Sequence, residues 1–174
     1  FCGVPLSEAV TGAHGPVSYL ADAQGVLATF TFREDLRDDA RAAVDALGAD
    51  GVQVQLLSGD APAASQALGR MAGIAKVRGG CSPNDKLAAM QHEQQAGHTV
   101  AMVGDGLNDG PVLAGAHVSF AFGRSVPLAR AQSDFVVLGE RLMAIADARL
   151  KSRETMRVVR QNLAWAGAYN VVGV

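Results

Sequence analysis

The 174-residue sequence contains few cysteines, few aromatic residues and no excess of basic residues. Its two cysteines, Cys2 and Cys81, stand far apart without Cys-x-x-Cys spacing, which gives no support to a disulfide framework or a structural zinc site. The net charge of -2 disfavours a strongly basic nucleic-acid-binding protein, so no nucleic-acid partner is expected. With 5% aromatic residues and 20 glycines, the composition indicates a turn-rich fold built on alanine and valine.

The sequence also has no long apolar run and no signal peptide at its start. The uncharged, mostly apolar stretch at residues 163–174 has 12 residues, whereas a membrane-spanning helix needs about 20. Because the sequence starts at Phe1 and ends inside this stretch, we expect it to be a fragment of a longer protein. The hydrophobic share of 49% and the charged share of 18% exclude a disordered chain.

Strand and helix patterns alternate along most of the chain. A hairpin with its turn at 22–25 is predicted within residues 17–32, and a long helix is predicted from residue 141 onward. The pattern between them predicts short strands at 52–57, 75–78, 99–103, 118–122 and 135–138, and helices at 38–47, 61–71, 84–95 and 127–131. This alternation predicts an α/β fold with a doubly wound parallel sheet, in which ligands bind beyond the carboxyl ends of the strands.

One polar loop follows the strand predicted at 99–103. Asp105 and Asp109 stand four residues apart across a glycine-containing turn, so their carboxylates can converge on a hard cation such as Mg²⁺. Gly106 allows close backbone approach, and the Asn108 amide can orient a phosphoryl group. The alternative is an ordinary capped turn, since Asp, Asn and Gly dominate turns.

A second polar loop, Ser58-Gly59-Asp60, closes the strand predicted at 52–57. Its hydroxyl and exposed backbone N–H groups are suited to hold phosphate oxygens, although the same residues would serve as an N-cap of the next helix. Lys86, at the start of a predicted helix, can supply a fixed positive charge to a phosphoryl group. Taken alone, such a lysine is more often a solvated side chain.

The order of these motifs, Ser-Gly-Asp, Pro-x-x-Lys and Gly-Asp-Gly-x-Asn-Asp, resembles the haloacid-dehalogenase superfamily. More narrowly, the set resembles the phosphorylation domain of a P-type ATPase, with residues 100–114 close to the family's hallmark and Glu34-Asp35-Leu36-Arg37 close to its hinge. The resemblance implies a haloacid-dehalogenase-like fold, ATP and Mg²⁺ as cofactors, and an aspartyl-phosphate intermediate. It assigns catalytic roles to Ser58, Lys86 and Asn108, cofactor binding to Gly59, Asp60 and Gly106, and magnesium to Asp105 and Asp109.

The segment Gln161-Asn162-Leu163-Ala164-Trp165-Ala166, followed by Tyr169-Asn170, is similar to the heavy-metal-transporting subgroup. In copper-type members a Tyr-Asn pair helps to form the metal path, which implies that Tyr169 and Asn170 contact a transported Cu⁺. The alternative is that both residues only pack within a helix bundle. The stretch at 110–116 is most similar to copper pumps associated with cytochrome oxidase assembly.

The chain departs from the family at several points. The Asp-Lys-Thr-Gly-Thr segment that holds the phosphorylated aspartate is absent, as are Cys-Pro-Cys and the His-Pro of the nucleotide domain. We therefore expect the intact protein to be an ATP-driven transporter and the chain alone to be inactive. Ser58 stands where the family usually has Thr, Glu34 where Asp is usual and Gly110 where Ala is common.

The resemblance also implies a domain division and a location. Residues 1–32 would end a nucleotide-binding domain and hinge, 33–148 would form a phosphorylation domain without its first strand, and 149–174 a basic linker helix and the start of a transmembrane helix. The basic residues just before the apolar stretch fit the cytoplasmic flank of such a helix.

The expected location is therefore a multi-pass protein of the cell inner membrane with residues 1–160 in the cytoplasm. The expected partners are the transported metal ion, the lipid bilayer and a metal-delivery protein. Two alternatives stay open at this point: a soluble phosphatase of the same superfamily, and a noncatalytic magnesium-binding regulatory module.

Overall fold

A computed structural model describes residues 17–22, 25–31, 35–104, 109–123, 125 and 127–173. The chain divides after Leu36 into two compact units. In the first unit, β1 (Val17–Asp22) and β2 (Gly25–Thr31) pair antiparallel, and Gly25 N–H donates to Asp22 Oδ1 at 3.0 Å across the turn. The hairpin predicted within residues 17–32 is thus confirmed.

The second unit, from Arg37 onward, alternates helices and strands and confirms the α/β class. Its elements in chain order are α1 (Ala40–Ala49), β3 (Gln55–Leu57), α2 (Pro62–Ala72), β4 (Lys76–Arg78), α3 (Pro83–Gln95), β5 (Ala101–Gly104), α4 (Gly110–Gly115), β6 (Val118–Phe122), α5 (Pro127–Ala131), β7 (Phe135–Val137) and α6 (Met143–Val172). The short helix α4 was not among the predicted elements.

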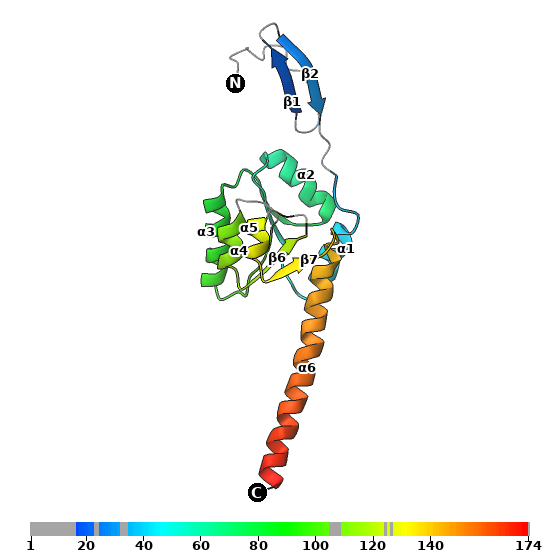
Figure 1. Cartoon of the computed structure of the whole chain (residues 1–174), viewed down its shortest axis with the longest axis vertical. Coiled ribbons are helices and arrows are strands. Elements are labelled where there is room, and N and C mark those ends of the chain that lie inside the picture. The colour runs from blue at the N-terminus through cyan, green and yellow to red at the C-terminus, as the bar shows by residue number, and fades with distance from the viewer. Residues whose placement is uncertain are drawn as a thin grey trace. The chain divides into compact units, whose positions relative to one another are not determined.

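The strands of the second unit form two parallel sheets within the described residues. Strand β3 pairs with β4, with Leu57 opposite Arg78, and β6 lies between β5 and β7. Helices α3, α4 and α5 lie on one side of β6 and β7, whereas α1 and the start of α6 lie on the other (Figure 1). Helices thus cover both faces, and the parallel strands direct their carboxyl ends toward a shared edge.

The core of this unit joins β6 to α4 and to the first turns of α6. Phe120 and Phe122 of β6 are buried together with Ile145 of α6. Val112 and Leu113 of α4 are almost completely buried. Burial of such side chains contributes about 1.5–3 kcal/mol each, so this packing accounts for the presence of a six-residue helix too short to be stable alone.

Helix α6 is attached to both ends of α1. Near the start of α1, Asp39 Oδ2 accepts the backbone N–H of Met143 at 2.9 Å, which lowers the pKa of Asp39 below its usual 3.8. At the other end, the Asp50 carboxylate accepts hydrogen bonds from Arg149 and Arg153. The Arg149 hydrogen bond is the main reason that the pKa of Asp50 is also lowered. These contacts fix the first three turns of α6 on the domain.

Beyond Arg153, α6 continues as an exposed helix to Val172. The long helix predicted from residue 141 is therefore confirmed. Within the ranges given above, no helix combines the length and the apolar character that crossing a membrane requires. Entry of α6 into a membrane stays a prediction.

We predict that the Asp50 contacts stabilise the domain at neutral pH and stop doing so in acid. A carboxylate whose pKa is lowered by folding contributes stability above its unfolded pKa, and this contribution is lost as the pH falls through its folded pKa. Asp50→Asn is therefore expected to lower the thermal midpoint at pH 7, by a few degrees at most for an exposed ion pair. As the pH falls from the unfolded value of 3.8 through the lower folded pKa of Asp50, the wild-type and variant midpoints are expected to converge.

Thermal unfolding followed by circular dichroism at pH 7 and at a series of acidic pH values measures this difference. Asp45→Asn is the matched control, because Asp45 pairs with Arg41 inside α1 and does not hold α6. A midpoint gap for Asp50→Asn that is as wide in acid as at pH 7 would contradict the attachment.

Candidate functional site

A cleft of about 360 Å³ lies at the carboxyl ends of β3 and β5. Its polar lining consists of five of the predicted site residues: Ser58, Gly59, Asp60, Lys86 and Asp109. Its apolar lining comes from the strands themselves: Leu56, Leu57, Met102, Val103 and Phe122. The structure thus brings the 58–60 loop, the start of α3 and Asp109 to one place, beyond the carboxyl ends of parallel strands, where ligands bind in such folds.

The loop at 58–60 is held by backbone hydrogen bonds that continue the β3–β4 ladder. Ser58 N–H donates to Arg78 O at 2.9 Å, Cys81 N–H donates to Ser58 O at 2.8 Å, and Gly80 N–H donates to Asp60 O at 2.7 Å. Gly79 is required here, because a Cβ at this position would lie 2.6 Å from Pro62 Cα. The loop is therefore rigidly placed before any ligand arrives.

The Ser58 hydroxyl faces the neighbouring Asp60. It donates to Asp60 Oδ2 at 2.6 Å and accepts from the Asp60 N–H at 3.1 Å. The interpretation of this loop as an N-cap of the following helix is wrong, since Ala61 is the N-cap of α2 and makes no side-chain capping bond. Ser58 lines the cleft, so its hydroxyl can donate a hydrogen bond to a ligand there instead of to Asp60.

Lys86 is positioned by the start of α3. Ser82 and Asp85 form a capping box, in which Asp85 N–H donates to Ser82 Oγ at 3.2 Å and Ser82 N–H donates to Asp85 Oδ2 at 2.9 Å. The hydrogen bond from the Ser82 hydroxyl is the main cause of a lowered Asp85 pKa. With Pro83 opening the helix, the first turn is well determined, and Lys86 follows in it.

An ion pair between Lys86 and Asp109 closes the polar side of the cleft. Lys86 Nζ lies 2.8 Å from Asp109 Oδ1, and the two side chains are only 16% and 11% exposed. Lys86 is therefore largely shielded from water, and the alternative interpretation of it as a solvated surface lysine is wrong. Removing one member of so buried a pair leaves an uncompensated charge, which costs about 3–5 kcal/mol.

Asp109 also packs tightly against the end of β5. A Cβ on Gly104 would lie 3.0 Å from Asp109 Cβ and 3.2 Å from Asp109 Oδ2, so a glycine at this position allows the carboxylate to approach the strand. Gly104 was not among the predicted site residues. Its position as the last residue of a strand that precedes an acidic loop is the signal that would have identified it.

Phe122 was also missed by the sequence analysis, which named Arg37 only as part of the hinge. The Arg37 guanidinium carbon lies 4.2 Å from the centre of the Phe122 ring, and Arg37 Nη1 donates to Glu140 O at 2.7 Å. Because Phe122 ends β6, beside β5, parallel pairing alone would have placed it at the cleft. Arg37 thus connects the beginning of the second unit to one wall of the cleft.

The other predicted site residues are either outside the described part of the chain or near the end of α6. Asp105, Gly106 and Asn108, together with Glu34 of the hinge, fall outside the described residues. Tyr169 and Asn170 lie in the last turns of α6, are exposed and do not line the cleft. In the described part of the chain, no group of three or more His, Cys, Asp or Glu side chains is arranged to hold a metal ion.

The assembled groups are suited to a phosphoryl group. A buried lysine supplies positive charge, a serine hydroxyl supplies a donor, and a loop containing Gly59 allows close approach of the backbone. Phosphoryl transfer depends on positioning and charge neutralisation more than on acid–base chemistry. The cleft therefore has the chemistry of a phosphoryl-binding site.

Comparisons with known proteins agree with this geometry. The sequence pattern of the haloacid dehalogenase-like hydrolases matches residues 8–117. A cation-transporting P-type ATPase B of Mycobacterium tuberculosis is 40% identical over 149 residues, which are 86% of this chain and 20% of that protein. A copper-exporting P-type ATPase of Staphylococcus aureus is 38% identical over 141 residues, which are 81% of this chain and 18% of that protein.

A solved structure shows the same likeness. The chain superposes on a crystal structure of a zinc-transporting PIB-type ATPase with a TM-score of 0.74 and 30% identity, over 87% of this chain and 25% of the other. The chain spans about a fifth of the length of the two curated relatives. The chain therefore belongs to the haloacid dehalogenase-like hydrolase family and, within it, to the heavy-metal-transporting P-type ATPases, of which it corresponds to the phosphorylation-domain portion.

Proposed function

We propose that this chain provides the phosphoryl-binding site of an ATP-driven copper transporter that works through an aspartyl-phosphate intermediate. The observation that carries the proposal is the cleft in which Ser58, Lys86 and Asp109 meet at the ends of β3 and β5. The aspartate that accepts the phosphoryl group from ATP is not encoded here, because the sequence has no Asp-Lys-Thr-Gly-Thr segment. The complete transporter would supply it.

The separation of the two parallel sheets supports this arrangement. Strands β3 and β5 belong to different sheets, and their Leu56, Leu57, Met102 and Val103 side chains form the walls of the cleft between them. Val103 of β5 is 36% exposed. A further strand that carries the phosphorylated aspartate would lie between β3 and β5, cover these side chains and end at the polar loops.

The residues of the cleft would then act on the phosphoryl oxygens. Lys86 would neutralise their negative charge at a fixed position, since its ion pair with Asp109 holds the ammonium group in place. Ser58 would exchange its hydrogen bond to Asp60 for one to a phosphoryl oxygen. Gly59 would let backbone N–H groups approach the same oxygens, and Gly106 and Asn108 are proposed to complete the contact from the loop after β5.

The donor set at this edge of the sheet fits Mg²⁺. The Asp60 and Asp109 carboxylates lie in the cleft, and carboxylate oxygens are the ligands that Mg²⁺ prefers, alongside waters and a substrate phosphate. Because Lys86 engages Asp109 Oδ1, we assign Asp109 the auxiliary position and Asp105 the principal one. When bound, Mg²⁺ would neutralise part of the charge on the transferred group.

The domain assignment is carried by the family resemblance, and its first boundary, after residue 32, lies four residues before the division into compact units after Leu36. We propose that residues 1–32 end the nucleotide-binding domain and hinge, that 33–148 form the phosphorylation domain, and that 149–174 link it to a membrane helix. Arg37, anchored on Phe122 and Glu140, would fix the domain end of the hinge. Residues 1–160 would lie in the cytoplasm under a multi-pass inner-membrane region, with a metal-delivery protein as a further partner.

Removal of Asp105 is expected to abolish the magnesium-dependent phosphoenzyme. In the complete transporter, Asp105→Ala should lower phosphoenzyme formation from labelled ATP by on the order of 10²-fold or more, because a preorganised charge contact in such a site typically contributes that much. His92→Ala is the control, since His92 is an exposed residue of α3 away from the cleft. Undiminished phosphoenzyme in Asp105→Ala would count against the site.

Removal of the Lys86 charge is expected to have a similar effect for a different reason. Lys86→Met should lower phosphoenzyme formation by about 10²-fold, because the phosphoryl oxygens lose their fixed counter-charge and Asp109 loses its partner. Lys76→Met is the matched control, because Lys76 is an exposed lysine of β4 that donates to Gln53. Equal phosphoenzyme levels in the two folded variants would reject the role of Lys86.

Copper is expected to be the preferred ion, and Tyr169 and Asn170 are expected to contact it. Transport by the complete protein in vesicles should be faster with Cu⁺ than with Zn²⁺. Asn170→Ala should slow Cu⁺ transport about tenfold or more. Ser152→Ala should not, since Ser152 is another polar residue of α6, whose hydroxyl donates to Arg149 O at 2.8 Å. Transport of Zn²⁺ without transport of Cu⁺ would contradict the copper assignment but would not contradict the proposed phosphoryl site.

A further inference from the structure

One side of α6 carries four arginines, and only the first two are attached to the domain. Arg149, Arg153, Arg157 and Arg160 recur at spacings of four, four and three, which places them on one side of the helix. Arg149 and Arg153 bind Asp50. Arg157 and Arg160 lie beyond this attachment and form no ion pair or side-chain hydrogen bond with any described residue. Their charges are therefore available to another molecule.

A shallow groove of about 580 Å³ runs along this side of α6. Arg153, Arg157 and Arg160 line it together with Met156, Gln161 and Ala164. Cationic and apolar side chains thus lie next to each other along the groove. This combination suits a ligand with an anionic group joined to an apolar body, because each guanidinium can hold phosphate oxygens bidentately.

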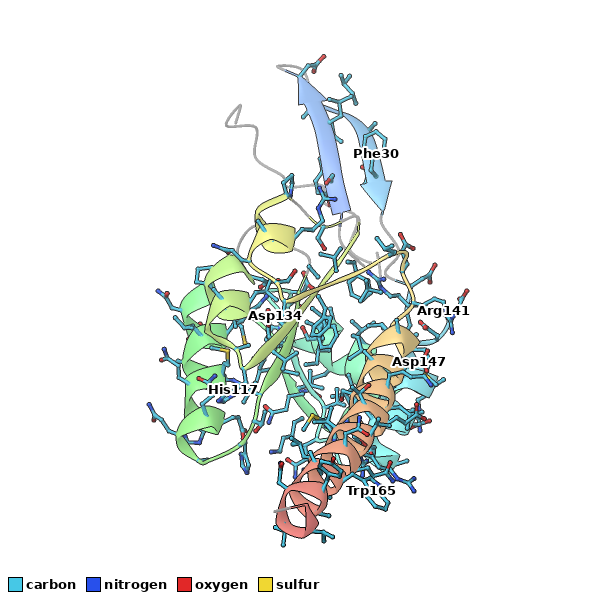
Figure 2. All side chains as sticks on the ribbon, turned by 60° about the horizontal axis from the view of Figure 1, so that its bottom comes forward. Phe30, His117, Asp134, Arg141, Asp147 and Trp165 are labelled. Carbon is cyan, nitrogen blue, oxygen red and sulfur yellow. The ribbon has the colours of Figure 1, made fainter. Side chains whose placement is uncertain are left out.

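Directly after Arg160 the helix loses its charges. Residues 161–172 contain no acidic or basic side chain and extend about 18 Å along the helix axis. Leu163, Trp165 and Tyr169 are 67%, 76% and 79% exposed, and Figure 2 shows Trp165 projecting from the C-terminal half of α6. Tryptophan and tyrosine are enriched where a helix passes from water into lipid.

The exposed apolar side chains of this segment are distributed around the whole helix. At 100° per residue, Trp165 and Tyr169 lie on the side opposite the arginines, whereas Val171 lies on the arginine side. A protein partner covers one face of a helix, but lipid surrounds it, and a helix that is apolar all round is buried in a core or in a membrane. The distribution therefore favours a lipid surface over an acidic protein.

We propose that Arg157 and Arg160 bind the phosphodiester headgroups of an anionic bilayer surface and set the depth at which α6 meets the membrane. This inference rests on the proposed function, since it takes the end of α6 to enter a bilayer. Two arginines at the surface of an anionic membrane contribute about fivefold each to partitioning. Loss of both is then expected to weaken binding about twenty-five-fold.

The test measures binding of the full chain to two kinds of vesicle. One kind is neutral phosphatidylcholine, and the other contains roughly 30–40% phosphatidylglycerol, which gives the vesicle surface a negative potential. Trp165 is the single tryptophan, so its fluorescence reports insertion of α6. Arg157→Gln/Arg160→Gln is compared with Arg41→Gln/Arg70→Gln, which removes the same charge from exposed positions on α1 and α2. The first variant should bind anionic vesicles about twenty-five-fold more weakly, and the second by less than about threefold.

Four other outcomes would overturn the inference, and each has a different meaning. Equal losses in both variants would show a response to net charge only. A Trp165 shift that is the same in neutral and anionic vesicles would reject the headgroup contact and leave membrane entry intact. No shift with any vesicle would reject membrane entry, and with it the placement of α6 in the proposed function. Binding to polyglutamate but to no vesicle would assign the arginines to an acidic protein partner.

Discussion

The ion pair between Lys86 and Asp109 is the contact on which the functional site depends. Its two members come from different elements, the first turn of α3 and the N-cap of α4, and they meet where β3 and β5 end. The pair is largely shielded from water, so it fixes a positive charge at one point of the cleft. The capping box at Ser82 and the tight approach of Gly104 to Asp109 both serve to hold this geometry.

A second set of charged contacts connects this site to α6. Asp39 and Asp50 bracket α1 and hold Met143, Arg149 and Arg153, while Ile145 packs against Phe122, which itself lines the cleft. Packed side chains thus join the cleft to the first turns of α6. In a transporter, such a connection would couple the phosphoryl site to the membrane region.

Local patterns in the sequence were sufficient for most elements of the fold. The hairpin, the parallel strands and the long C-terminal helix follow from apolar periodicity and from turn residues, which act over a few neighbouring positions. Helix α4 was missed because Gly110, Pro111 and Gly115 interrupt any helical pattern, and only the burial of Val112 and Leu113 makes it helical. Strand β3 is shorter than the predicted 52–57 because only residues 55–57 find partners in β4.

Five of the predicted site residues line the cleft, but the contacts between them were not predicted. The order of the motifs identified Ser58, Lys86 and Asp109, yet the pairing of Lys86 with Asp109 spans 23 residues and depends on how α3 and α4 pack. Phe122 belongs to no motif and Arg37 only to the hinge-like stretch at 34–37, so their contact became apparent only from the tertiary packing. Contacts between elements are a property of the tertiary fold, which short patterns do not encode.

The central claim is that the cleft between β3 and β5 receives an aspartyl phosphate. The most direct measurement is a structure of the complete transporter with Mg²⁺ and beryllium fluoride, which mimics that group. We expect fluoride ligands within about 3.2 Å of Ser58 Oγ and Lys86 Nζ, with Ser58 turned away from Asp60. A beryllium fluoride group bound away from both side chains, with the Ser58–Asp60 hydrogen bond unchanged, would contradict it.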